Sequence, residues 1–103
     1  NMATETTENR SIVSFVLSGE KLPKETNNLD LISKFGSELY QKNRDYIREK
    51  VKDNWFIVIE PVSGTLFASP EQLELYQHAK EIFPDRLFFS VGLAKDNFIH
   101  YAR

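Results

Sequence analysis

Apolar side chains between residues 29 and 52 recur every three or four positions, which is the spacing of one buried helix face. The stripe consists of Ile32, Phe35, Leu39, Tyr46 and Ile47. Asn27 or Asn28 is suited to cap the start of this helix, and Asp30 favours the positive end of the helix dipole. The pattern predicts one continuous helix over residues 29–52.

A different pattern follows at residues 55–59, where aromatic and β-branched residues stand in an unbroken apolar run. Such a run is typical of a strand with apolar contacts on both faces. The turn-forming residues 60–64 separate it from a second short apolar run at residues 65–68. The two runs predict a β-hairpin.

Residues 69–72, Ser-Pro-Glu-Gln, have the chemistry of a helix start: a serine cap, a proline at the first helical position and a glutamine that completes a capping box. We expect this helix to end at residue 83, because the residue before Pro84 avoids helical geometry. The alternation at residues 86–93 then predicts a third strand. Residues 98–101 predict a short last strand.

This order of elements predicts the α+β class, with a small antiparallel or mixed sheet of three to four strands and two helices packed on one face. The helix between the strands at 65–68 and 86–93 favours a crossover that makes these two strands parallel. The strand at 55–59 then lies between them and is antiparallel to both. The apolar run at 12–17 fits either an edge strand or a segment laid over another surface.

We expect one domain over residues 11–103. Residues 1–10 are polar and have no hydrophobic period, which predicts a mobile tail. Asn1 precedes Met2, so we expect Asn1 to be left over from cloning and Met2 to be the natural start.

Strand alternation leaves a second apolar row on the sheet face opposite the two helices. This row consists of Phe56, Val58, Phe67, Phe88 and Tyr101. Burying one Phe contributes roughly 1.5–3 kcal/mol, so an exposed row of this kind would be costly. We expect the row to be covered by residues 12–17, by a second copy of the chain or by another protein, or else to line a small-molecule pocket.

The second apolar face predicts a non-enzymatic protein-interaction or regulatory module, bound to itself as a homodimer or to another protein. The alternative is a small enzyme or ligand-binding protein with a pocket at the sheet rim. Its candidate residues are Glu60, Ser63 and His100, since they are the polar side chains expected near that rim. No residue pattern assigns a catalytic role.

Charge and composition narrow the alternatives. The 103 residues include 13 basic and 15 acidic side chains, a net charge of −2, which argues against a non-specific nucleic-acid binder. Basic residues between 42 and 52 alternate with acidic ones, as on a solvated helix face.

The chain has no cysteine, and its two histidines lie far apart in sequence, so we expect no metal and no cofactor. No apolar run is long enough for a membrane span or a secretory signal, which predicts a cytoplasmic protein without a membrane partner.

The stretch from Trp55 to Val91 combines a tryptophan-led strand, a P-x-S-G turn, a capped helix and a P-D-x-x-F-F-x-V strand. It resembles short bacterial proteins of the cyanobacterial type, a group with no established activity. Because the shared parts are turn and capping residues, the resemblance implies a fold and adds no functional residue.

Overall fold

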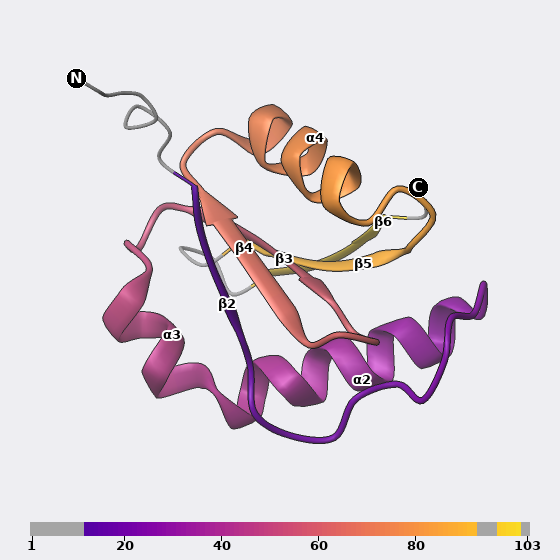
Figure 1. Cartoon of the computed structure of the whole chain (residues 1–103). Helices are drawn as coiled ribbons and strands as arrows, with labels where there is room; N and C mark the ends of the chain where they lie inside the picture. Colours follow the sequence, from indigo (N-terminus) through magenta and orange to yellow (C-terminus); the bar gives the residue numbers. More distant parts are fainter. Residues whose placement is uncertain (1–11, 93–96, 102–103) are drawn as a thin grey trace.

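The computed structural model describes residues 12–92 and the backbone of residues 97–101. The expected tail at residues 1–10 lies outside the described residues. Five strands form one sheet: β2 (Val13–Val16), β3 (Phe56–Glu60), β4 (Thr65–Ser69), β5 (Phe88–Gly92) and β6 (Asn97–Tyr101). Their order is β2-β4-β3-β5-β6, and every neighbouring pair is antiparallel (Figure 1).

The α+β class is confirmed, and so is the predicted placement of β3 between β4 and β5. Since β3 is antiparallel to both neighbours, β4 and β5 run in the same direction. The sheet has more strands than expected because the apolar run at 12–17 joins it as the edge strand β2, paired to β4.

The helix predicted over 29–52 is broken at Asn43 into α2 (Leu29–Lys42) and α3 (Arg44–Lys50). The Asn43 side chain is buried, and its Nδ2 donates to the carbonyl oxygens of Leu39 and Ser18, each at 2.8 Å. These bonds compete with regular helical geometry and tie the helix junction to the residues after β2. At the other end of α2, the Asn28 side chain accepts hydrogen bonds from the Asp30 and Leu31 amides, which confirms the predicted cap.

Helix α4 (Gln72–Ile82) begins two residues later than the capping pattern predicts. Ser69 is instead the last residue of β4, although its Oγ still accepts a hydrogen bond of 3.1 Å from the Glu71 amide. The helix ends before Pro84, as expected.

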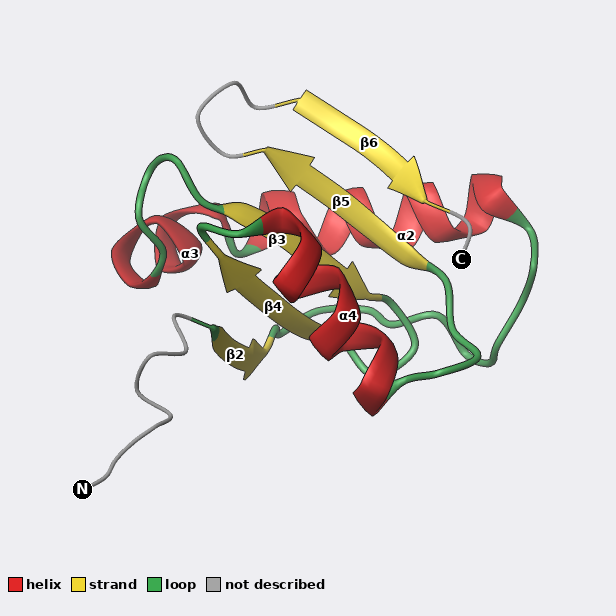
Figure 2. Cartoon of the chain, turned by 90° about the horizontal axis from the view of Figure 1, so that it is seen from above, coloured by secondary structure: helices red, strands yellow, loops and turns green. Residues whose placement is uncertain are grey.

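The prediction that both helices pack on one face is wrong. Helix α4 packs on β3 and β4 from one side of the sheet, whereas α2 packs on β5 and β3 from the other side, with α3 continuing that layer (Figures 1 and 2). The strands are apolar on both faces, so each face needs its own helical cover.

Two hydrophobic cores result, one on each side of the sheet. The core under α2 and α3 includes Ile57, Ile59, Leu66, Phe89 and Val91, together with Ile32, Leu39, Tyr40 and Ile47 from the helices. The core under α4 includes Val58, Phe67 and Phe88, together with Leu75 and Ala79.

Helix α2 approaches β5 closely at Gly36. A Cβ atom added there would lie 2.4 Å from the Cβ atom of Phe89, well inside any allowed contact distance. The missing side chain therefore sets how deeply α2 sits against the sheet.

Candidate interaction surface at the β2 edge

The apolar row predicted to be an interface is covered inside the molecule. Of this row, Val58, Phe67 and Phe88 are buried and Phe56 is half-buried. Leu75 and Ala79 of α4 pack against them, and α4 takes the place that was expected for residues 12–17 or a partner. Tyr101 lies opposite Phe88 in the β5–β6 register, and its side chain lies outside the described residues. This sheet face is thus an internal core under α4, which corrects the prediction that residues 12–17 or a partner cover it.

Two of the three predicted pocket residues do meet, in the turn between β3 and β4. Glu60 is buried, and its carboxylate accepts hydrogen bonds from the amides of Val62 at 3.1 Å and Ser63 at 2.8 Å. The same carboxylate pairs with Arg86 at 3.1 Å. These contacts satisfy the carboxylate oxygens, so the Glu60 side chain serves to hold the turn.

The third predicted pocket residue, His100, is not brought next to Glu60 by the register. His100 lies opposite Phe89, and Phe89 lies opposite Ile59, the neighbour of Glu60 on β3. Two strand spacings, about 10 Å, therefore separate the backbone of His100 from β3. Direct acid–base partners come within about 3 Å or share one water, so this placement does not favour the pocket.

Arg86 joins the turn to the segment before α2. Its guanidinium pairs with Glu25 at 3.0 Å as well as with Glu60, and it lies over the ring of Phe83 at 5.4 Å. Partial burial lowers the pKa of Arg86, but the hydrogen bond to Glu25 and the charge of Glu60 outweigh it and raise the pKa above its ordinary value. The guanidinium stays charged and holds the segment in place.

Within the described residues, no group of three or more His, Cys, Asp or Glu side chains is arranged to hold a metal ion. In the same part of the chain, none of the helices combines the length and the apolar character needed to cross a bilayer.

Strand β2 is one of the two edge strands of the sheet, and β6 forms the opposite edge. Among the described residues, the one strand partner of β2 is β4. Because α4 packs on β3 and β4 and α2 on β5 and β3, neither of these two helices is centred on β2 (Figure 2). Among the described residues, no strand pairs with the outer edge of β2.

The hydrogen-bond pattern shows which backbone groups point to that outer edge. The amide of Leu17 donates to the carbonyl of Gly64 at 2.9 Å, which continues the β2–β4 register as a hydrogen-bonded pair. In an antiparallel ladder such pairs recur at every second residue, so Phe15 also bonds toward β4. The N–H and C=O groups of Ser14 and Val16 point outward instead.

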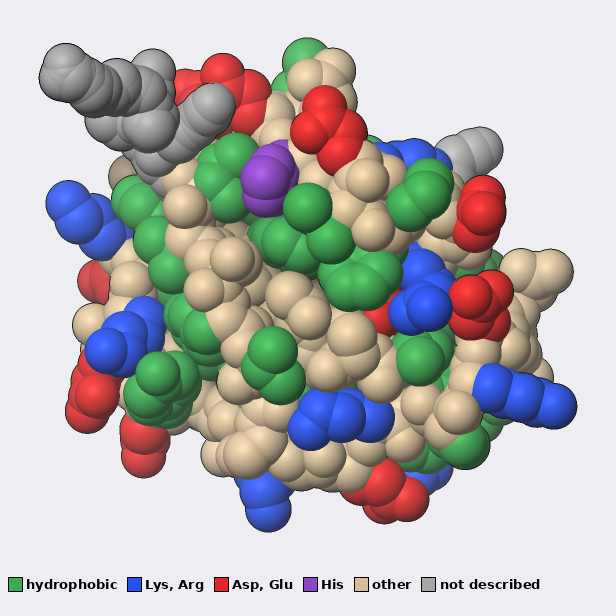
Figure 3. Space-filling model, in the orientation of Figure 1, with side chains coloured by type: hydrophobic (Ala, Val, Ile, Leu, Met, Phe, Trp, Pro, Cys, Tyr) green, Lys and Arg blue, Asp and Glu red, His purple; other side chains and the backbone are tan. Residues whose placement is uncertain are grey.

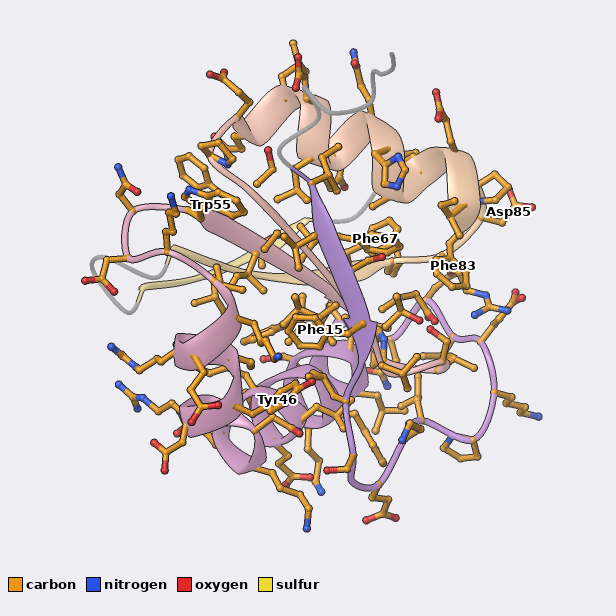
Figure 4. The ribbon with its side chains drawn as sticks, turned by 60° about the vertical axis from the view of Figure 1, so that its left-hand side comes forward. Phe15, Tyr46, Trp55, Phe67, Phe83 and Asp85 are labelled. Atoms are coloured by element: carbon orange, nitrogen blue, oxygen red, sulfur yellow. The ribbon has the colours of Figure 1, made fainter. Side chains whose placement is uncertain are left out.

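Two aromatic rings flank β2 on the side of α3. The rings of Phe15 and Tyr46 meet edge to face with centroids 5.3 Å apart, and Figure 4 labels both residues on the side of β2 where α3 lies. Tyr46 is 47% exposed although it is a large aromatic residue. The Lys50 ammonium group lies 5.4 Å from the centre of the Tyr46 ring. This flank thus presents aromatic surface beside the open edge.

The side of β2 toward α4 is also apolar. Val16 is 65% exposed, and Ser14 lies opposite Phe67 in the register. The ring of His78 packs edge to face on Phe67, with ring centroids 5.6 Å apart. Ile82, one helical turn further along α4, is 53% exposed. In Figure 3, green apolar side chains gather between α4 and β2.

We name the β2 edge surface from these residues: Ser14, Phe15, Val16 and Tyr46. Natural edge strands are usually protected by a charged residue, a proline, a bulge, a covering segment or a very short length. Strand β2 is short, at four residues, and residues 12–19 contain neither a charged residue nor a proline. The candidate site is thus a short, uncharged edge strand with apolar flanks.

The sequence left two possibilities for residues 12–17, an edge strand or a segment laid over another surface, and the structure shows the edge strand. The available signal was the uncharged run itself, since a strand with this composition is normally buried or paired. Tyr46 was assigned to the buried helix stripe, but its side chain is 47% exposed and its ring meets Phe15 of β2.

Comparison with known proteins adds no assignment: no family model, curated protein or solved structure matches the chain. The resemblance of residues 55–91 to short bacterial proteins stays a prediction.

Proposed function

We propose that the protein is a non-enzymatic interaction module that binds another polypeptide through the β2 edge surface. The partner adds a strand to the outer edge of β2, which is β-augmentation. The observation that carries this proposal is the uncharged edge of β2, where Ser14 and Val16 direct their backbone groups away from β4 and Val16 is 65% exposed.

The flanking residues supply the selectivity that backbone pairing lacks. Main-chain hydrogen bonds give affinity to any extended strand, whereas pockets for alternate side chains select its sequence. Phe15 and Tyr46 favour an aromatic or aliphatic partner residue on the α3 side. Val16 favours an apolar one on the α4 side.

The contacts of Glu60 support an interaction module over the enzyme alternative. Its carboxylate is the only buried acidic group among the described residues, and two amides and Arg86 already satisfy it. A general acid or base needs a proton path to substrate, and this carboxylate faces the turn that it stabilises.

A short extended peptide tests the proposal. The probe has the sequence of residues 12–18, with lysines at both ends for solubility, and it is added to the ¹⁵N-labelled full chain. We expect the amide resonances of Ser14 and Val16 to shift and their hydrogen exchange to slow. Protection at Phe15 should change little, because its amide already bonds to β4.

The matched control is the same peptide with N-methyl groups on its internal amides, which removes the hydrogen-bond donors from both of its edges. It should leave the Ser14 and Val16 resonances in place. Equal shifts with both peptides, or no shift at Ser14 and Val16 with the first, would contradict edge-strand binding.

A further inference from the structure

The register of β2 makes it complementary to a second copy of itself. We propose that two copies of this chain pair their β2 strands antiparallel about a two-fold axis through Phe15, which joins the two sheets into one. This inference rests on the proposed function and names the partner strand as β2 of the second copy.

The backbone groups fit this pairing without a shift in register. The outward groups belong to Ser14 and Val16, the residues on either side of Phe15. When Phe15 lies opposite Phe15 of the second copy, Ser14 lies opposite Val16 of that copy. Val16 then lies opposite Ser14 of that copy. Each such pair exchanges both of its hydrogen bonds, so every outward group of these two residues finds a partner. A contact of this kind is self-complementary, as a two-fold interface requires.

The side chains also match across the axis. An antiparallel ladder alternates hydrogen-bonded and non-hydrogen-bonded pairs, and the Cα atoms of a non-hydrogen-bonded pair are closer, about 4.5 Å apart. The two Phe15 residues form such a non-hydrogen-bonded pair in the proposed dimer. The Phe15 ring already meets Tyr46 at 5.3 Å. The pairing therefore brings two Phe15–Tyr46 pairs into one aromatic cluster and covers part of the exposed Tyr46 ring. On the other face, Val16 of each copy packs beside Ser14 of the other.

Charge favours a second copy over a charged partner. Residues 12–19 carry no charged side chain, so two identical strands meet without repulsion. The two α3 helices come to the same side of the joined sheet. Each α3, with the sequence RDYIREK, mixes acidic and basic side chains, so this approach does not place like charges alone against each other.

Sedimentation equilibrium on the full chain, up to about 1 mM, measures the self-association. We expect the wild type to form dimers. Val16→Lys should raise the dimer Kd by about tenfold or more, since a lysine on the edge blocks strand pairing. The matched control is Leu73→Lys on α4, where the side chain is 70% exposed and belongs to a different element of the fold. It should change the Kd by less than about twofold.

Cysteine pairing then tests the register, because the natural chain has no cysteine. Ser14→Cys and Val16→Cys both replace exposed residues, and the two variants are mixed in equal amounts and oxidised. The proposed register places Cα atoms of residues 14 and 16 about 5.5 Å apart across the interface, within disulfide range. We expect the disulfide between residue 14 of one copy and residue 16 of the other to form more often than random collision would give. Intact-mass spectrometry measures the fraction of each disulfide-linked dimer.

The outcomes separate this inference from the proposed function. A chain that stays monomeric but binds the residue 12–18 peptide overturns self-pairing and leaves edge-strand binding in place. Dimers that survive Val16→Lys, or that oxidise mainly as 14–14 or 16–16 pairs, also overturn the proposed register. A chain that neither dimerises nor binds the peptide overturns both proposals.

Discussion

Replacing Gly36 by alanine tests the close approach of α2 to β5. In an exposed helix interior, alanine is more favourable than glycine by about 1 kcal/mol. At position 36 the added Cβ atom would lie 2.4 Å from the Cβ atom and 2.6 Å from the Cγ atom of Phe89. Phe89 is buried, and these two atoms lie next to its backbone, so rotation of the ring does not relieve the contact.

The expected cost combines these two effects. Forcing an extra methyl group into a packed core costs about 1–3 kcal/mol, and the severity of this contact places Gly36→Ala near the upper end. After the helix gain of about 1 kcal/mol is subtracted, the free energy of unfolding should fall by about 2 kcal/mol. For a domain of this size, the melting temperature should fall by about 10 °C.

The assay is urea unfolding followed by circular dichroism, with thermal melting as a second measure. Glu38 provides the matched position in the same helix, since its side chain is 56% exposed. The difference in free energy of unfolding between Glu38→Ala and Glu38→Gly measures how much alanine stabilises α2 relative to glycine where no contact with Phe89 is made. If Gly36→Ala stabilises the protein by that same amount, the close packing of α2 on β5 is refuted.

Two further substitutions test the buried polar contacts. Glu60→Gln removes the charge paired with Arg86 and should lower the free energy of unfolding by about 1–3 kcal/mol. Glu25 is the exposed partner of the same guanidinium, so Glu25→Gln should lower the free energy of unfolding by less than about 1 kcal/mol. Equal effects at Glu60 and Glu25 would contradict a structural role for the buried pair. Asn43→Ala removes the side-chain hydrogen bonds at the α2–α3 junction and should lower the free energy of unfolding by about 2–3 kcal/mol. Asn27→Ala, at an exposed site, should lower it by less than about 0.5 kcal/mol. Urea unfolding measures both values. A neutral Asn43→Ala would show that its bonds do not hold the junction.

Local patterns explain why the strands and their order were predictable. The unbroken apolar run of β3 and the turn residues after it specify a hairpin within a few residues of each other. The helix between β4 and β5 then limits the sheet to few arrangements, and β3 between them is one of these. The Asn28 cap was predictable for the same reason, since its partners Asp30 and Leu31 are close in sequence.

Contacts between distant segments explain what the sequence did not predict. Asn43 lies in a run with helical spacing, and the break there depends on Ser18, which is 25 residues away. Which face of the sheet α4 covers also depends on which face α2 covers. No short stretch of sequence contains information about both helices. The open edge became visible only when β2 was paired with β4, which exposed Val16 and left Tyr46 beside it.

The pairing of β2 with β4 has a consequence for the newly made chain. Val16 emerges from the ribosome about 50 residues before its partner Thr65, and translation adds about 5–20 residues per second. The apolar run that becomes β2 therefore waits roughly 3–10 s before β4 exists to receive it. During this interval it is a ready binding site for a chaperone or for the same run of a neighbouring nascent chain.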